Sequence, residues 1–301
     1  MACSPHVPHV GLIVNPFASA VDEHRIALVE RTLAAHADVE LHLTERRGHA
    51  TELAQQLAPR MDAIFVFSGD GGFNEVVNGV AADAPPLGCI PGGGTSVFPR
   101  GLGLPRDPVQ ATEILASSFE AGRTRRISVG RVNGRRFLFN AGLLFDAELV
   151  RRIEAQRSQA GRPGDVAFAA TVVKLVGEHR GRFDPVLEIE GLGRAAFVLV
   201  ANAAPYTYLG SIAVNAAPEA RLELGLDVVA PARVRPRHIP GLLRFVLTGR
   251  SRPANVLALH DADHVAVHCD IELPLQADGE DLGDVAEAVF EAERGALTVL
   301  V

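Results

Sequence analysis

The feature that most constrains the fold is a glycine-rich turn that joins an apolar run to a helix-like segment. Residues 63–67 are all apolar and lead into Ser68-Gly69-Asp70-Gly71-Gly72, after which residues 73–80 carry apolar side chains at a spacing that suits a helix. This order predicts a strand, a tight turn and a helix. Glycines let the backbone approach a ligand closely, and the N–H groups at a helix start attract anions. The turn therefore indicates a phosphate-binding site.

Asp70 lies in the middle of this turn. A carboxylate is a poor partner for phosphate unless a divalent cation lies between them, so Asp70 favours a nucleotide site with Mg2+. The alternative is an ordinary strand-to-helix turn with a capping aspartate. The sequence has no Walker A pattern, Gly-x4-Gly-Lys-Ser/Thr, which excludes P-loop chemistry. It also lacks the Gly-x-Gly-x-x-Gly fingerprint, which weakens a Rossmann dinucleotide interpretation.

Strand-like and helix-like segments alternate through residues 1–128. We expect strands at 9–14, 39–43, 63–67 and 87–91, and helices at 21–37, 49–57 and 108–121. This alternation predicts βαβ units and a mostly parallel sheet, hence a three-layer α/β domain. A second glycine loop, residues 92–96, follows the strand at 87–91. Because the ends of parallel strands share one sheet edge, the two loops are expected to form a phosphate cradle from two sides.

Residues 129–281 have a different pattern. Asn133-Gly134 stands between two strand-like runs, which is a strong hairpin indication. Further strands are expected at 186–190, 196–200, 226–229, 264–269 and 273–276, and helices at 146–154 and 166–177. The pattern predicts a mostly antiparallel β domain with helical insertions. The C-terminal tail, 282–301, is able to pack back on the first domain.

Charge and cysteine content narrow the class of partners. The net charge of −7 argues against a general nucleic-acid binder, which usually carries a basic excess. Three widely separated cysteines fit a reducing compartment. The N-terminal residues do not form a signal peptide, and no apolar run approaches 18 residues. We expect a cytoplasmic protein that can still touch the inner membrane surface from that side. A homodimer is compatible with the sequence, which does not fix the oligomeric state.

Five stretches together resemble the diacylglycerol kinase catalytic family, in particular bacterial lipid kinases that are similar to sphingosine and ceramide kinases. They are 14–16, Ser68 to Gly79, 87–104, Phe139 to Gly142 with Phe145-Asp146, and Ala277 to Glu280. The resemblance implies a two-domain kinase with an ATP-binding α/β domain, 1–128, and a β-sandwich lipid-substrate domain, 129–281, with ATP held between them. It implies transfer of the γ-phosphate of ATP to the hydroxyl of a lipid, diacylglycerol or a relative, in phospholipid biosynthesis.

The resemblance also implies roles for individual residues. Those that hold the triphosphate are Asn15, Thr44, Ser68, Gly69, Asp70, Gly71, Gly72, Asn74, Glu75, Gly93, Gly94 and Thr95. Asp70 would act on ATP through Mg2+. Glu280 would take the proton from the attacking hydroxyl, with Asp278 as a competitor or a supporting partner. The alternative for Asp278 and Glu280 is a solvated acidic turn.

The sequence departs from the family pattern in both glycine loops. Gly72 stands where the family usually has Thr, and Gly93-Gly94-Thr95-Ser96-Val97 replaces Gly-Thr-Gly-Asn-Asp. The structural Mg2+ stretch of some relatives, Asp-Gly-x-Leu-Asp, is present only as Glu223-Leu224-Gly225-Leu226-Asp227. Two other functions therefore stay open. One is a catalytically weak lipid-binding or regulatory protein on the same fold, and the other is a kinase for a soluble substrate such as NAD.

Two further segments have competing interpretations. Pro231 to Arg252 holds six arginines and no acid among apolar residues, which predicts a segment that docks on anionic lipid. The alternative is a helix that covers the sheet. The second segment is the set of histidines and aspartates between His260 and Asp270, which suggests a metal site. Alternation along a strand explains the positions of His264 and His268 on one face equally well.

Overall fold

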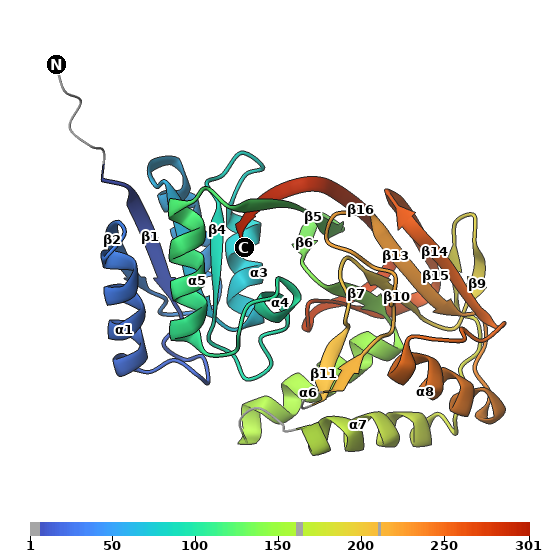
Figure 1. Ribbon diagram of the computed structural model, residues 1–301. Helices are drawn as coiled ribbons and strands as arrows, with labels where there is room; N and C mark the ends of the chain where they lie inside the picture. The colour runs from blue at the N-terminus through green and yellow to red at the C-terminus, as the bar shows by residue number, and fades with distance from the viewer. Residues whose placement is uncertain (1–6, 161–164, 210–211) are drawn as a thin grey trace. The chain divides into compact units, whose positions relative to one another are not determined.

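The computed structural model describes residues 7–160, 165–209 and 212–301 and divides into two compact units (Figure 1). The first unit contains the described residues up to Ile127 together with Gly295–Val301, and the second contains Ser128–Arg294. The tail 282–301 is thus shared, because its residues 295–301 belong to the first unit and its residues 282–294 to the second.

The first unit is built on a parallel sheet. Its strands run in the order β2 (Asp38–Leu43), β1 (His9–Val14), β3 (Ala63–Ser68) and β4 (Leu87–Pro91). Val299, near the end of β16 (Glu280–Leu300), pairs with Leu87 in the same parallel sense. All six residues of β3 are buried, as expected for an apolar strand covered on both faces.

Helices cover both faces of this sheet. They are α1 (Glu23–Ala34), α2 (His49–Leu57), α3 (Asp70–Gly79), α4 (Val97–Gly101) and α5 (Pro108–Glu120), with the short 3-10 helix η1 (Ala58–Arg60) after α2. Helix α1 packs on α5, and α2 packs on α3. The expected three-layer α/β architecture is confirmed. Helix α1 begins later than the expected 21–37 because the Asp22 side chain accepts from the Arg25 N–H and caps the helix start, and it ends at Ala34.

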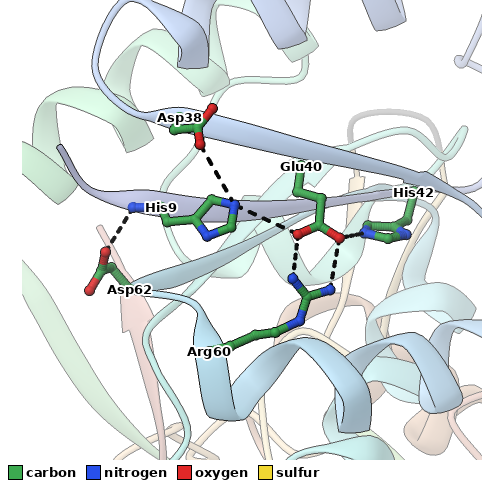
Figure 2. Close-up of polar contacts among 6 residues, drawn as sticks. All are labelled: His9, Asp38, Glu40, His42, Arg60 and Asp62. Carbon is green, nitrogen blue, oxygen red and sulfur yellow. Dashed lines mark hydrogen bonds and ion pairs between the residues drawn. The ribbon is translucent and has the colours of Figure 1, made fainter.

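Ion pairs hold the edge strand β2 (Figure 2). The Glu40 carboxylate accepts from both terminal nitrogens of Arg60, at 2.5 and 2.7 Å, and lies 2.7 Å from Nε2 of His42. His9 lies 3.6 Å from the same carboxylate. The hydrogen bonds from Arg60 lower the pKa of Glu40 to about 2. Since His9 begins β1, this cluster lies away from the strand ends that lead into the glycine loops.

The second unit is built on antiparallel strands. The main path runs in the order β14 (Val256–Ala262), β13 (Leu226–Pro231), β10 (Val198–Ala201), β7 (Asn140–Leu143), β15 (His264–Ala277) and β16. The shorter strands are β5 (Thr124–Val132), β6 (Arg135–Phe137), β8 (Leu187–Ile189), β9 (Gly193–Ala195), β11 (Thr207–Leu209) and β12 (Ile212–Val214). Their inward side chains form one core that includes Phe137, Val267 and Phe290.

The sequence located some of these strands and missed others. The Asn133-Gly134 turn joins β5 to β6 with φ of 47° and 88°, which confirms the expected hairpin. Strand β16 was not expected beyond residue 281, because its charged residues and two glycines, Gly283 and Gly295, interrupt the apolar alternation.

Helices flank the strands of the second unit. They are α6 (Phe145–Ala160), α7 (Asp165–Glu178) and α8 (Ile239–Thr248), with a 3-10 turn, η2 (Pro236–His238), before α8. The helices expected at 146–154 and 166–177 are confirmed, and α6 extends further than expected. In the part of the chain that the structure describes, no helix is long and apolar enough to cross a membrane.

Candidate functional site

The two glycine loops are in direct backbone contact at the carboxyl edge of the parallel sheet. The N–H of Gly92 donates to the carbonyl of Ser68 at 2.7 Å, so the loop after β4 is tied to the end of β3. A Cβ atom at Gly93 would lie 2.9 Å from the Cα of Gly69, closer than real Cβ contacts allow. Only glycine at position 93 permits this approach, and the loop sequences therefore follow from the backbone packing.

Asp70 joins the two loops through its side chain. Its carboxylate accepts from the backbone N–H groups of Val97 and Phe98, each at 3.1 Å, at the start of α4. Ser96, directly before α4, has φ of 46° and donates its hydroxyl to the Gly93 carbonyl at 2.8 Å. Asp70 therefore has a structural role in the second loop that the sequence analysis did not anticipate.

A cavity of about 170 Å³ opens beside this edge. Its polar lining residues come from four segments and are Asn15, Thr44, Glu45, Arg46, Arg47, Ser68 and Glu75. Gly72 lines the same cavity. Two arginines and two glutamates thus line the space where the glycine turn begins helix α3, and the Arg46 guanidinium donates to the Glu52 carboxylate at 2.6 and 2.8 Å.

The Ser68 hydroxyl is buried in this lining without a visible partner. Ser68 is 2% exposed, and its Oγ has no hydrogen-bond partner among the residues that the structure describes. A Cβ atom at Gly72 would lie 2.0 Å from this Oγ. The Ser68 hydroxyl therefore occupies the space that a side chain at position 72 would need.

The other expected phosphate ligands have local roles as well. Asn15 accepts from the Phe17 N–H at 3.0 Å and shapes the loop after β1, while Thr44 is buried at the end of β2. Glu75 accepts from the Ala50 N–H at 3.2 Å and caps helix α2, whose own N-cap residue has no side chain. Glu75 also lines the cavity, so the same residue caps helix α2 and contributes to the cavity wall.

Seven expected residues lie outside the lining of that cavity, namely Gly69, Asp70, Gly71, Asn74, Gly93, Gly94 and Thr95. Asn74 is buried within α3 and accepts from the Asn78 side-chain amide at 3.1 Å. The carbonyl of Gly94 accepts from the Arg106 guanidinium at 3.0 Å, which ties the second loop to the segment before α5. Thr95 follows in the same loop. The structure thus gives Asn74 and Gly94 visible packing roles in the first unit.

In the second unit, Asp278 and Gly279 form the turn between β15 and β16. Ala277 pairs with Glu280, and φ is 48° at Asp278 and 81° at Gly279, the geometry of a type I′ turn. The Asp278 carboxylate accepts from three consecutive backbone N–H groups, at 2.6, 2.8 and 3.2 Å, those of Leu138, Phe139 and Asn140. Asp278 therefore fixes the chain segment that enters β7.

Glu280 has a more open environment. Its carboxylate forms an ion pair with Arg135, and the side chains of both residues are 33% exposed. Within the described part of the chain, no backbone N–H donates a hydrogen bond to the Glu280 carboxylate, in contrast to Asp278. Its carboxylate can therefore change partners at a lower cost than that of Asp278.

A buried polar network that the sequence analysis did not identify lies under this turn. Asp146 is buried and accepts from the Tyr206 hydroxyl and the Gln276 side-chain amide. The carbonyl oxygen of the same Gln276 side chain accepts from the Gly279 N–H at 2.9 Å. Burial raises the pKa of Asp146 to about 6, although both hydrogen bonds act in the opposite direction. The network thus connects a carboxyl group that titrates near neutrality to the Asp278-Gly279 turn.

The sequence held only part of the information needed to find this network. Asn140 and Asp146 belong to a stretch that matched the family, but Gln276 and Tyr206 have no motif around them. Gly142 supports the arrangement, because a Cβ there would lie 2.7 Å from Oδ2 of Asp146. A glycine four residues before a buried aspartate is a weak indication by itself.

The aspartates of the segment from His260 to Asp270 form ion pairs with arginines. Arg294 pairs with Asp261 and Asp263, and Arg194 pairs with Asp270. Among the described residues, Glu219, Asp227 and His260 are the only set whose ligand atoms lie within 4.8 Å of one another. Within this set, Nδ1 of His260 lies 2.8 Å from Oδ1 of Asp227, which is an ordinary ion-pair distance.

Comparisons with known proteins cover both units. Residues 9–132 match the model of the diacylglycerol kinase catalytic domain, and residues 143–301 match the model of the YegS C-terminal NAD kinase beta sandwich-like domain. A diacylglycerol kinase of Bacillus subtilis (strain 168) is 36% identical over 136 residues, which are 44% of this chain and 44% of that protein. A diacylglycerol kinase of Staphylococcus saprophyticus is 37% identical over 100 residues, 32% of each chain. The aligned parts thus span less than half of these relatives.

The fold also matches solved structures. The crystal structure of a diacylglycerol kinase from Bacillus anthracis str. Sterne superposes with a TM-score of 0.73 over 98% of this chain and 97% of the other, at 24% identity. This similarity confirms the expected fold class, an α/β domain followed by a β-sandwich-like domain.

Proposed function

The chain belongs to the family that joins a diacylglycerol kinase catalytic domain to a YegS-type C-terminal domain, and on this premise we propose that it is an ATP-dependent lipid kinase. It would transfer the γ-phosphate of ATP to the hydroxyl of diacylglycerol or a related lipid. The observation that carries the proposal is the cavity beside the glycine turn, where two arginines and a buried, unpartnered hydroxyl line one space. Such a lining suits a phosphate-bearing ligand.

The first unit supplies what nucleotide binding needs. A Cβ at Gly71 would meet nothing within 4 Å, so the first loop leaves room for phosphate oxygens close to the backbone, and Arg47 and Arg46, the latter paired with Glu52, line the cavity. We place Asp70 beside Mg2+, with its two oxygens also accepting the N–H groups of Val97 and Phe98, because a carboxylate is a ligand that this ion prefers. Mg2+ keeps several waters and phosphate oxygens as ligands, so a single protein carboxylate suffices. When bound, the ion would neutralise charge that develops on the phosphates.

The second unit supplies candidates for proton transfer. We assign Glu280 as the acceptor of the hydroxyl proton, because its carboxylate is partly exposed and held only by an ion pair with Arg135. Asp278 is better suited to a supporting role, since its oxygens accept three backbone hydrogen bonds. Asp146, whose pKa lies at about 6, is the second candidate for holding a proton near neutral pH.

A transfer assay tests the proposal. The purified chain is incubated with labelled ATP, Mg2+ and a panel of lipids that contains diacylglycerol, sphingosine and ceramide, with NAD as a soluble acceptor. We expect label in one lipid and a loss of at least a hundredfold in Glu280→Gln. Glu287→Gln is the matched control, because Glu287 lies on the same strand with its side chain 54% exposed.

The outcomes separate the three functions. Label in NAD alone would replace the lipid substrate with a soluble one. No transfer to any acceptor, together with no measurable ATP binding, would favour a regulatory lipid-binding protein on the same fold.

We also propose that the segment from Pro231 to Arg252 contacts an anionic membrane surface. In helix α8 only Phe245 is buried, while Leu243 and Leu247, one turn apart, are 56% and 43% exposed. Arg244 is exposed between them, and its guanidinium donates to the Ser251 hydroxyl at 2.7 Å. Exposed leucines beside arginines on a helix suit the boundary between headgroups and acyl chains.

Not all arginines of this segment are equally suited to lipid contact. Arg235 pairs with Asp184 at 2.5 Å and is tied to its own unit. Arg244 and Arg250 have no carboxylate partner among the described ion pairs, so they are the better candidates for headgroup contact.

A further inference from the structure

The stretch from Glu223 to Asp227, which leads into β13, resembles the one that carries a structural Mg2+ in some relatives. We propose that in this chain the guanidinium of Arg294 takes the place of that ion, so that the second unit is stable without a bound divalent cation. The proposal concerns the stability of the second unit and does not depend on the proposed transfer reaction.

The donor groups at this stretch do not fit Mg2+. Asp227 is 3% exposed, and its Oδ1 accepts from the Asp261 N–H at 3.2 Å and lies 2.8 Å from Nδ1 of His260. Mg2+ requires a near-ideal octahedron of oxygen ligands, whereas an imidazole suits other metals. Glu223, which stands where the pattern of those relatives begins with Asp, is exposed. The residues present therefore do not form an oxygen cage around Asp227.

Protein groups close the backbone around Asp227 instead. The register between β13 and β14 shifts at this residue, so that Asp227 lies opposite both His260 and Asp261, which is a β-bulge. The Asp227 carboxylate accepts from the Asp261 N–H, and the Asp261 carboxylate accepts from the Gly225 N–H at 2.7 Å. The two carboxylates thus hold the bulge through the main chain.

Arg294, the last residue of the second unit on β16, binds this bulge from the other side. Its Nη1 lies 2.8 Å from Oδ1 of Asp261, and its Nε donates to Oδ1 of Asp263 at 2.5 Å. Its Nη2 donates to the backbone carbonyl of Asp261 at 3.2 Å. One side-chain cation therefore meets two carboxylates and a main-chain carbonyl, which are the kinds of oxygen that a hard divalent ion takes as ligands.

The guanidinium also packs against the backbone of the stretch itself. A Cβ atom at Gly225 would lie 2.8 Å from Nη2 of Arg294 and 2.6 Å from the carbonyl oxygen of Ala262, both shorter than real Cβ contacts allow. Glycine at position 225 lets the loop before β13 approach both groups. Arg294 thus fills the space over Gly225 and supplies positive charge between the loop and the turn from β14 to β15.

The first experiment measures metal dependence on the full chain without nucleotide. The protein is purified without chelator, and its content of Mg2+, Ca2+ and Zn2+ is measured by mass spectrometry. We expect no stoichiometric metal. Because a ligand that binds only the folded state raises the unfolding temperature, we also expect the same unfolding midpoint in EDTA and in excess Mg2+.

The second experiment removes the guanidinium. Arg294→Gln should lower the unfolding midpoint by about 2 to 4 °C, since three nitrogens lose their acceptors. Arg294→Lys should recover only part of this loss, because an ammonium keeps the charge but not the planar arrangement of donors. Arg252→Gln is the matched control, because it makes the same change of charge at an exposed residue of the same unit, and it should keep the wild-type midpoint.

The outcomes are distinct. Stoichiometric metal in the purified protein, or a lower midpoint of the wild type in EDTA, would overturn the proposal even if Arg294→Gln does not fold. A midpoint of Arg294→Gln equal to that of Arg252→Gln would also overturn it. Neither result would affect the proposed kinase function, which the transfer assay tests separately.

Discussion

The carboxylate of Asp70 accepts a hydrogen bond of 3.1 Å from the backbone N–H of Val97, 27 residues further along the chain. The contact links the first glycine loop to the second, so one aspartate shapes both sides of the candidate phosphate site. The carboxylate therefore has a structural role in the apoprotein, which is separable from the role beside Mg2+ that we propose for it when nucleotide is bound.

We expect Asp70→Asn to lower the free energy of unfolding of the apoprotein by about 1 to 2 kcal/mol, because the two N–H groups at the start of α4 lose a charged acceptor. Chemical denaturation without nucleotide measures this change. Asp83→Asn, an exposed site of the same unit, is the control. Wild-type stability in Asp70→Asn would show that the carboxylate matters only when ligand is present.

Substitutions at Asp278 and at Glu280 should differ in their effects, the first lowering stability and the second lowering activity. Asp278→Asn keeps a residue that tolerates the left-handed turn, but it weakens the acceptor of three backbone N–H groups, so we expect a loss of about 1 to 3 kcal/mol in unfolding free energy. Glu280→Gln breaks one partly exposed ion pair and should cost less than about 1 kcal/mol. Thermal unfolding of the two variants, compared with transfer activity, checks the pair. Equal stability of both variants would contradict the structural role of Asp278.

Asp146 should make stability depend on pH. Its pKa is raised by burial from 3.8 to about 6, so the folded state binds more protons than the unfolded state between these values. Stability should therefore fall as pH rises from about 4 to 6 and then level off, with a total change of about 3 kcal/mol.

Asp146→Asn removes the titrating group and should flatten this part of the profile. Denaturant unfolding at pH 4, 5, 6 and 7 measures both profiles, with Asp83→Asn as a variant that keeps the wild-type slope. A profile of Asp146→Asn as steep as that of the wild type would assign the pH dependence to another group.

Glu40 should make the stability of the protein depend on pH at the acid end of the range. The hydrogen bonds from Arg60 lower its pKa from 4.5 to about 2, so the stabilisation is present above pH 4.5 and is lost as pH falls toward 2. Because the Glu40 side chain is 31% exposed, we expect only about 1 kcal/mol at pH 7. Acid unfolding of Glu40→Gln should begin at a higher pH than in the control Glu113→Gln, and identical acid midpoints would contradict this assignment.

The arginines beside α8 should govern binding to anionic vesicles. Arg244→Glu reverses a charge between two exposed leucines and should weaken cosedimentation with phosphatidylserine vesicles about tenfold at low salt. Vesicles of phosphatidylcholine alone should bind weakly in every case. Arg31→Glu on α1 makes the same change of net charge in the other unit and should leave binding unaltered. Equal effects of both substitutions would show that vesicle binding depends on net charge and not on the position of Arg244.

Sequence alone predicted the four parallel strands β1 to β4 of the first unit and the helices α1, α2, α3 and α5, but not α4 or the pairing of β16 with β4. Apolar runs such as residues 63–67 and the glycine turn that follows them fix strand, turn and helix through local sterics and periodicity. The same local chemistry located the Asn133-Gly134 hairpin and the Asp278-Gly279 turn, since few residues tolerate positive φ.

The roles within the candidate site were decided by tertiary structure. The sequence showed an aspartate at 70 and another at 278. It did not show which backbone N–H groups donate hydrogen bonds to each carboxylate. Gln276 meets Asp146 from 130 residues away, and Tyr206 meets it from 60 residues away, so no local pattern records their network. Burial, which raises the pKa of Asp146, likewise exists only once these segments have packed together. The sequence determined the residue at position 72, and the packed structure placed the hydroxyl of Ser68 beside it, because that proximity depends on how β3 and α3 meet.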